Sequence, residues 1–214
     1  MTIKKLLIFG MPRSGTTLLQ NVLAYYLNID NYNEPFTGHN LQMSIKDPYQ
    51  WASNLSNGVL KVVSHNLNFV NFENLISAGN FDSVVITHRE NLTDIIISSY
   101  YADKITQQYH YKELPKNITP FIFPLDYIDV VLVLYRQYKE TLDNLDKKLI
   151  PYTIFDYDKY QTGELQIIAG VDVLVNDVNN KFETISANIS YNQVCLNYNE
   201  VKKNVEQLIR EDDR

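Results

Sequence analysis

A short stretch near the N-terminus, GMPRSGTTLLQ at positions 10–20, gathers two glycines, three hydroxyl side chains and one cation. An apolar run precedes it and apolar residues at helical spacing follow it, so it connects a predicted strand to a predicted helix. The free N–H groups at the start of a helix attract an anion, and the glycines let the backbone curl around that anion. Hydroxyl donors and a positive charge strengthen this attraction, so the stretch predicts a phosphate-binding site. Its residues are Gly10, Pro12, Arg13, Ser14, Gly15, Thr16 and Thr17.

A second cation stands where another predicted strand, 82–89, comes to its end. The segment ITHRENLTDIIISSYY supplies Arg89 at the strand end and Ser98 about two turns into the helix expected over 92–107. A guanidinium can bind a phosphate through two parallel hydrogen bonds while the serine hydroxyl donates a third. The pair therefore predicts a second phosphate contact, although a surface ion pair and a helix-packing hydroxyl would give the same pattern.

Candidate general bases follow two extended segments. Glu34 lies in NEPF, and His65 ends GVLKVVSH, which is predicted to be a buried strand over 58–65. Both are expected at the sheet edge where the phosphate loop emerges. Lys61 and His65 are four residues apart, a spacing that puts both side chains on one face of a strand. A capping or surface carboxylate and a solvent-facing imidazole are the plain alternatives, and the choice between Glu34 and His65 stays open.

The pattern GxPRSGTTLL resembles the phosphosulfate-binding loop of the sulfotransferases that use 3′-phosphoadenosine 5′-phosphosulfate (PAPS). The resemblance touches most of the chain but is specific only in this loop and in the Arg89–Ser98 pair. It implies that Arg13 grips the phosphosulfate, and that Arg89 and Ser98 bind the 3′-phosphate of PAPS and of its product PAP. Glu34 is similar to the base in the "EP" segment of carbohydrate- and protein-directed members. Lys61 and His65 resemble the Lys-X-His of cytosolic members, with a longer spacing.

The resemblance implies an enzyme that transfers a sulfuryl group in line from PAPS to a hydroxyl or amine of a small-molecule, glycan or lipid acceptor. Arg13 would stabilise the charge that builds on the leaving phosphate, and Glu34 or His65 would take the proton, in a scheme that needs no metal ion. Lys61 would assist at the sulfuryl group, and a surface lysine of an edge strand is the plain alternative. The C-terminal basic segment of cytosolic members is not visible, and Lys181 is its candidate substitute. The acceptor pocket is expected in the loops near 36–57 and 108–124.

Two other functions stay open. A P-loop kinase or another enzyme of nucleoside triphosphates would carry Lys after the second glycine and an acid for Mg²⁺ at a strand end. This chain has Thr16 and Arg89 at those places. A non-catalytic protein that binds PAP or PAPS through the same fold is the other alternative. It would keep nucleotide binding without Glu34 and His65.

The order of predicted elements gives the fold class. Buried strands alternate with helices, which predicts an α/β protein of three layers, α/β/α, with a mainly parallel central sheet of the P-loop nucleotide-binding type. We expect one domain over 1–214, because no linker, repeat or low-complexity tract interrupts the chain. The remaining predicted elements are strands at 3–9 and 151–157, helices at 16–28, 71–79, 126–148 and 199–209, a partly helical stretch at 41–55 broken by Pro48, and an ambiguous segment at 163–190.

Composition narrows the class of protein further. The 214 residues are 45% hydrophobic and carry a net charge of −6, which fits a globular protein and argues against nucleic acid as a partner. The apolar run at 3–9 is too short for a membrane span or a secretory signal. Cys195 is the only cysteine, which suits a reducing compartment. We therefore expect a cytoplasmic protein without a membrane span.

Overall fold

Four parallel strands form the central sheet of the computed structural model, which describes residues 3–38, 40, 45–107, 118–174 and 189–212. The strands are β1 (Lys5–Gly10), β2 (Gly58–Val63), β3 (Ser83–His88) and β4 (Thr153–Asp156). Their order in the sheet is β2-β1-β3-β4, and every neighbouring pair is parallel. All four strands therefore end at the same edge, which is where a parallel sheet holds its ligands.

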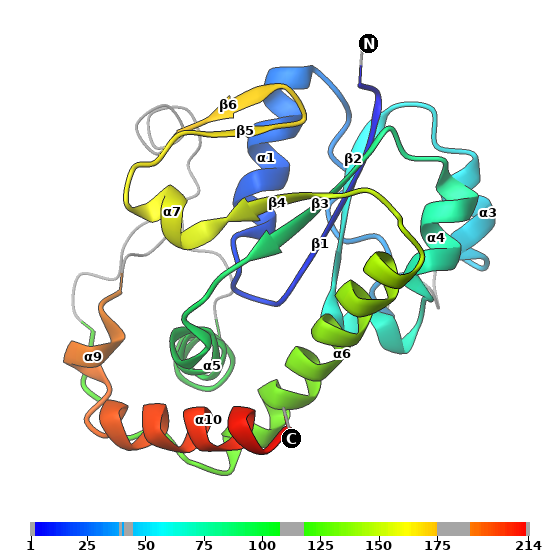
Figure 1. Cartoon of the computed structure of the whole chain (residues 1–214). Helices are drawn as coiled ribbons and strands as arrows, with labels where there is room; N and C mark the ends of the chain where they lie inside the picture. The colour runs from blue at the N-terminus through cyan, green and yellow to red at the C-terminus, as the bar shows by residue number, and fades with distance from the viewer. Residues whose placement is uncertain (1–2, 39, 41–44, 108–117, 175–188, 213–214) are drawn as a thin grey trace.

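Helices cover both faces of this sheet, which confirms the predicted α/β/α architecture (Figure 1). Successive side chains of β1 point to opposite faces, so Leu6 and Ile8 pack on one side while Leu7 and Phe9 pack on the other. The first face is covered by α1 (Thr16–Leu27), α7 (Tyr157–Gln161) and the hairpin of β5 (Gln166–Ile168) and β6 (Val171–Val173). The second face is covered by α3 (Pro48–Ser53), α4 (Phe72–Gly79), α5 (Leu92–Tyr100), α6 (Tyr127–Lys147) and α10 (Tyr198–Asp212).

The order in which strands are added to the sheet reverses at β1: β2 lies on one side of β1, and the chain then crosses over to form β3 on its other side. Helix α1, which follows β1, packs on one face, whereas α5, which follows β3, packs on the opposite face. Because β1 and β3 are neighbours, the loops that leave their ends lead to opposite faces of the sheet, and parallel sheets commonly bind ligands at such a point. This point of the fold is therefore the expected place for a ligand.

Several element ends differ from the sequence prediction. The strand predicted over 58–65 ends at Val63, because the Asn66 side chain accepts a hydrogen bond from the Val63 N–H at 2.9 Å and the chain turns into the 3₁₀ helix η1 (Ser64–Asn68). The helix predicted over 92–107 changes to a π-helix, η2 (Tyr101–Thr106). Pro48 does not break a helix but begins α3, a position that needs no N–H donor. The ambiguous segment forms the β5–β6 hairpin, and its residues 175–188 lie outside the described part.

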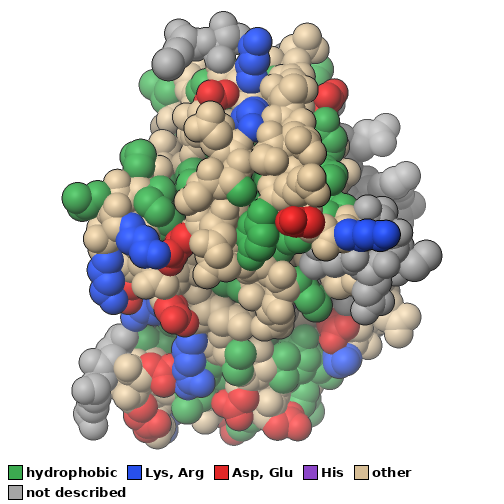
Figure 2. Space-filling model, turned by 90° about the vertical axis from the view of Figure 1, so that its right-hand side faces the viewer, with side chains coloured by type: hydrophobic (Ala, Val, Ile, Leu, Met, Phe, Trp, Pro, Cys, Tyr) green, Lys and Arg blue, Asp and Glu red, His purple; other side chains and the backbone are tan. Residues whose placement is uncertain are grey.

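In the described part of the chain, none of the helices combines the length and the apolar character that a transmembrane segment requires. On the face shown in Figure 2, basic and acidic side chains are interspersed and no basic stripe stands out.

Candidate active site

The loop between β1 and α1 is fastened to the end of β3. The Ser14 hydroxyl donates to the Met11 carbonyl at 2.7 Å and lies 2.6 Å from the Thr87 hydroxyl. A Cβ atom on Gly10 would come within 1.9 Å of that same Thr87 hydroxyl, so the close contact requires a glycine. The Ser14 side chain, which is buried, thus holds the loop in shape.

Arg13 connects the two predicted phosphate motifs. Its Nε donates to the Ser98 hydroxyl at 2.9 Å, and the Arg89 guanidinium donates to the Arg13 carbonyl at 3.3 Å. Arg13 has a positive φ of 66°, a conformation that costs a non-glycine residue about 1–2 kcal/mol. Both arginines therefore lie together beyond the ends of β1 and β3, and the Ser98 hydroxyl, expected beside Arg89 as a further phosphate donor, accepts a hydrogen bond from Arg13.

The first turn of α1 presents its backbone N–H groups at the same place. Gly15 is the N-cap residue with φ of 87°, and no side chain makes a capping hydrogen bond to this helix start. Thr16 is buried beside the loop, while Thr17 lies further into the first turn. Uncapped N–H groups and the helix dipole together favour a bound anion.

Replacing Gly15 by alanine is expected to destabilise the fold more than the same change at Gly163. Both residues have a left-handed backbone, with φ of 87° and 85°, which costs alanine about 1 kcal/mol or more. A Cβ atom on Gly15 would also come within 2.4 Å of the Tyr157 ring, whereas no atom lies within 4 Å of one on Gly163. Urea unfolding should give a loss at least about 1 kcal/mol larger for Gly15→Ala. Equal losses would mean that Tyr157 does not press on the loop.

Glu34, Lys61 and His65 form a cluster beside the loop. Residues 30–33 run along the outer edge of β2, with the Tyr32 N–H bonded to the Val59 carbonyl and the Lys61 N–H bonded to the Asn33 carbonyl. Glu34 consequently lies 2.8 Å from His65 Nε2 and 3.6 Å from Lys61 Nζ. Lys61 also donates to the Thr17 hydroxyl, which ties the cluster to the first turn of α1.

The surroundings of this cluster set its charge. Burial pushes the pKa of Glu34 up, but the hydrogen bond with His65 and the charge of Lys61 outweigh it, so the pKa lies below its ordinary value. Burial also lowers the pKa of Lys61, although the carboxylate of Glu34 opposes this. Glu34 is therefore an ionised carboxylate at neutral pH and can accept a proton. Its side chain is 21% exposed and that of His65 44%, so the pair is accessible to a reacting molecule.

Arg89 has partners that the sequence interpretation missed. Its guanidinium lies 3.3 Å from Asp94 and 3.6 Å from Asp158, and it packs over the Tyr157 ring with 5.3 Å between the guanidinium carbon and the ring centre. Asp94 also accepts a hydrogen bond from the Tyr198 hydroxyl at 3.0 Å. Burial raises the pKa of Asp94, Arg89 opposes this rise and Asp158 adds to it. Two carboxylates therefore compete with any phosphate for Arg89.

Lys181 and residues 108–117 of an expected acceptor loop lie outside the described residues. Within the described ranges no group of three or more His, Cys, Asp and Glu residues could hold a metal ion. Comparison with known protein families finds no family model that matches this chain, and comparison with curated protein sequences finds no match either.

Proposed function

We propose that the protein is a sulfotransferase that moves a sulfuryl group from PAPS to an acceptor hydroxyl or amine. The observation that carries this proposal is the meeting of two anion-binding features with a proton acceptor at one edge of the sheet. The uncapped start of α1 and Arg13 are the anion-binding features, and Glu34, hydrogen-bonded to His65, is the proton acceptor. The contact between Lys61 and Thr17 joins the two.

Each residue has a role in this proposal. The donor supplies an activated sulfate, bound by the loop N–H groups, Arg13 and Lys61. The acceptor oxygen forms a bond to sulfur as the bond between sulfur and the phosphate oxygen breaks, and that phosphate keeps the electron pair. Glu34, supported by His65, takes the acceptor proton. Positive charge from Arg13 and Lys61 stabilises the leaving phosphate.

The same arrangement fits a nucleoside-triphosphate enzyme less well. Such an enzyme uses a lysine after the second glycine of the loop and an acid at a strand end to hold Mg²⁺. Thr16 and Arg89 occupy these positions, and the lysine that contacts the first turn of α1, Lys61, comes from β2 instead. Since Cys195 is a buried free thiol, we propose the cytoplasm as the place of action.

A thermal-shift comparison tests the cofactor. PAP and PAPS are expected to raise the melting temperature, because a ligand that binds only the folded state stabilises it. ATP and ADP with Mg²⁺ should have a smaller effect. Stabilisation by ATP with Mg²⁺ and none by PAP would overturn the proposal. Transfer itself is then measured with labelled PAPS and a panel of hydroxyl and amine acceptors.

Asp94→Asn is expected to tighten PAP binding roughly three- to tenfold, because one of the two carboxylates that compete for Arg89 loses its charge. The asparagine oxygen can still accept the Tyr198 hydrogen bond. Calorimetry with PAP measures the change. The matched control is Asp143→Asn, which removes the same charge from the exposed side of α6 and should leave affinity unchanged. If both variants bind PAP like the wild type, Arg89 does not contact the nucleotide.

A further inference from the structure

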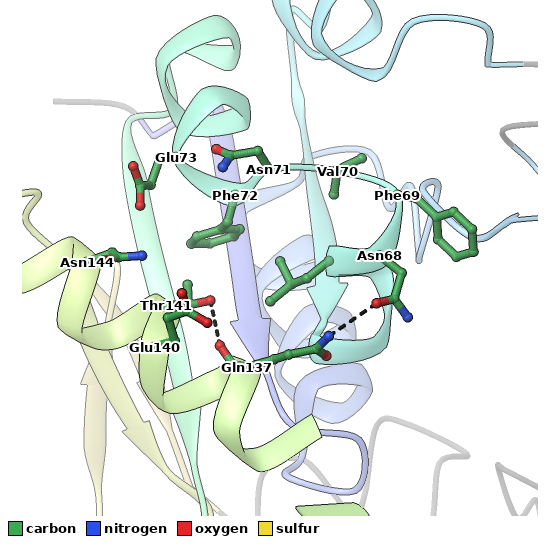
Figure 3. Close-up of a pocket in the computed structure, with 11 residues that line it drawn as sticks. Asn68, Phe69, Val70, Asn71, Phe72, Glu73, Gln137, Glu140, Thr141 and Asn144 are labelled. Atoms are coloured by element: carbon green, nitrogen blue, oxygen red, sulfur yellow. Dashed lines mark hydrogen bonds between the residues drawn. The ribbon is translucent and has the colours of Figure 1, made fainter. Parts of the chain in front are cut away.

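A polar pocket lies between η1, the start of α4 and the middle of α6, apart from the phosphate loop (Figure 3). Its volume is about 440 Å³, within the range of small-molecule sites. The polar residues that line it are Asn68, Asn71, Glu73, Gln137, Glu140, Thr141 and Asn144. The loops expected to form an acceptor pocket, 36–57 and 108–124, contribute none of its described lining residues.

The chemistry of this lining selects a class of ligand. Four side chains are amides, which can both donate and accept hydrogen bonds, as each hydroxyl of a sugar also does. Two are carboxylates, and Glu73 is held by an ion pair with Lys148. None of the described lining residues is Lys, Arg or His, so an anionic ligand would meet only negative and neutral groups. The lining therefore suits a neutral molecule with many hydroxyl groups.

The pocket begins one helical turn from the candidate base. His65 and Asn68 are three residues apart in η1, and in a 3₁₀ helix such side chains lie on the same face, about 6 Å apart along the axis. Asn68 accepts a hydrogen bond from Gln137 Nε2 at 3.2 Å, which joins η1 to α6. The next residue, Tyr138, reaches the Thr87 carbonyl at the end of β3 at 3.4 Å. One end of the pocket is thus at the sheet edge that carries the proposed active site.

The side chain of Gln137 is a second observation that indicates a ligand with hydroxyl groups. Its Nε2 bonds to Asn68, but its Oε1 is buried and has no hydrogen-bond partner among the described residues. A buried acceptor without a donor is uncommon in folded proteins and calls for a ligand or a solvent molecule. That oxygen is shielded from solvent in this arrangement, so it meets the donor it lacks, a sugar hydroxyl, when the Gln137 side chain turns toward the pocket.

We propose that this pocket binds a neutral saccharide and that the saccharide is the acceptor whose hydroxyl receives the sulfuryl group. The inference rests on the proposed function for the transfer step but not for the binding step. Glu34, supported by His65, takes the hydroxyl proton as the hydroxyl oxygen bonds to sulfur and the bond between sulfur and the phosphate oxygen breaks, so that PAP leaves with the electron pair.

Titration of the ¹⁵N-labelled protein with cellobiose, lactose and N,N′-diacetylchitobiose tests the binding step, because amide signals of residues 68–73 and 137–144 should shift with at least one of them. Gln137→Leu should weaken that binding tenfold or more and leave PAP affinity unchanged. Gln207→Leu makes the same change on the exposed side of α10 and should have no effect. Asn144→Leu is a second pocket variant, and circular dichroism verifies that each variant is folded.

The outcomes separate this inference from the proposed function. Sulfation of 2-naphthol from PAPS without saccharide binding at these residues would overturn the saccharide pocket and keep the transferase. Saccharide binding that Gln137→Leu and Asn144→Leu both leave intact would also overturn it. Saccharide binding without any binding of PAP or PAPS would instead overturn the proposed function, and the acceptor role with it.

Discussion

Glu34→Gln is expected to lower the rate of sulfuryl transfer about 10²- to 10⁴-fold, the usual contribution of a positioned general base, and to leave PAP affinity unchanged. Glutamine keeps the size of the side chain and can still accept the His65 hydrogen bond, but it cannot take a proton. Single-turnover kinetics with labelled PAPS measure the transfer, and calorimetry with PAP measures the affinity. A variant as active as the wild type would exclude Glu34 as the base.

His65→Asn is the matched comparison for that experiment. If His65 only orients Glu34, His65→Asn should lose less transfer activity than Glu34→Gln does. The transfer rate of His65→Asn should then still fall at acidic pH, as it does in the wild type. If His65 is the base, His65→Asn should be the inactive variant and Glu34→Gln the partly active one. The two variants therefore decide which member of the hydrogen-bonded pair accepts the proton.

The Glu34 carboxylate should also make the free energy of unfolding depend on pH. Because the folded-state pKa of Glu34 lies below its ordinary value of 4.5, its ionised form stabilises the fold above that pH. This contribution is lost as the pH falls through the lower, folded-state value. Glu34→Gln should therefore make the free energy of unfolding less dependent on pH below 4.5. Urea unfolding over a pH series measures this, and identical pH profiles would show that Glu34 is not held by Lys61 and His65.

Sequence alone predicted those parts of the site that lie close together along the chain. The strand–loop–helix unit around Gly10 and Gly15 has a local pattern, and so has Arg89 at a strand end. Glu34, Lys61 and His65 were candidates because of their chemistry, but the sequence did not predict that Glu34 would contact the other two. His65 was expected in β2 and lies in η1, and it reaches Glu34 because residues 30–33 run beside β2.

Other parts of the structure form only when elements that are distant in the sequence pack together. Asp158 follows β4, and it reaches Arg89 because β4 pairs with β3. No local sequence pattern indicates which cation Asp158 contacts. The polar pocket likewise depends on α6 packing against η1 through Gln137 and Asn68. Amide side chains on two separate helices share no sequence pattern, so the sequence did not predict that they would contact one another.

Arg13→Gly is expected to weaken PAP binding about 10- to 100-fold, the loss of a charge-assisted phosphate contact of about 1.5–3 kcal/mol, and to change stability by no more than about 1 kcal/mol. Arginine holds an unfavourable positive φ at this position, and glycine adopts that conformation freely. Relief of the unfavourable backbone conformation stabilises the folded state. This offsets the loss of the Ser98 hydrogen bond and the greater freedom that glycine gives the unfolded chain. The substitution thus removes the guanidinium without distorting the loop.

Arg13→Lys is the control for charge alone. Lysine keeps the positive charge but lacks the planar fork that binds phosphate and Ser98 at once, so its affinity for PAP should lie between those of the wild type and Arg13→Gly. Calorimetry with PAP and urea unfolding of all three proteins give both quantities. If Arg13→Gly binds PAP as the wild type does, the loop does not hold the nucleotide through Arg13. If instead Arg13→Gly lowers stability by several kcal/mol, the arginine acts chiefly as a structural link between the β1–α1 loop and α5.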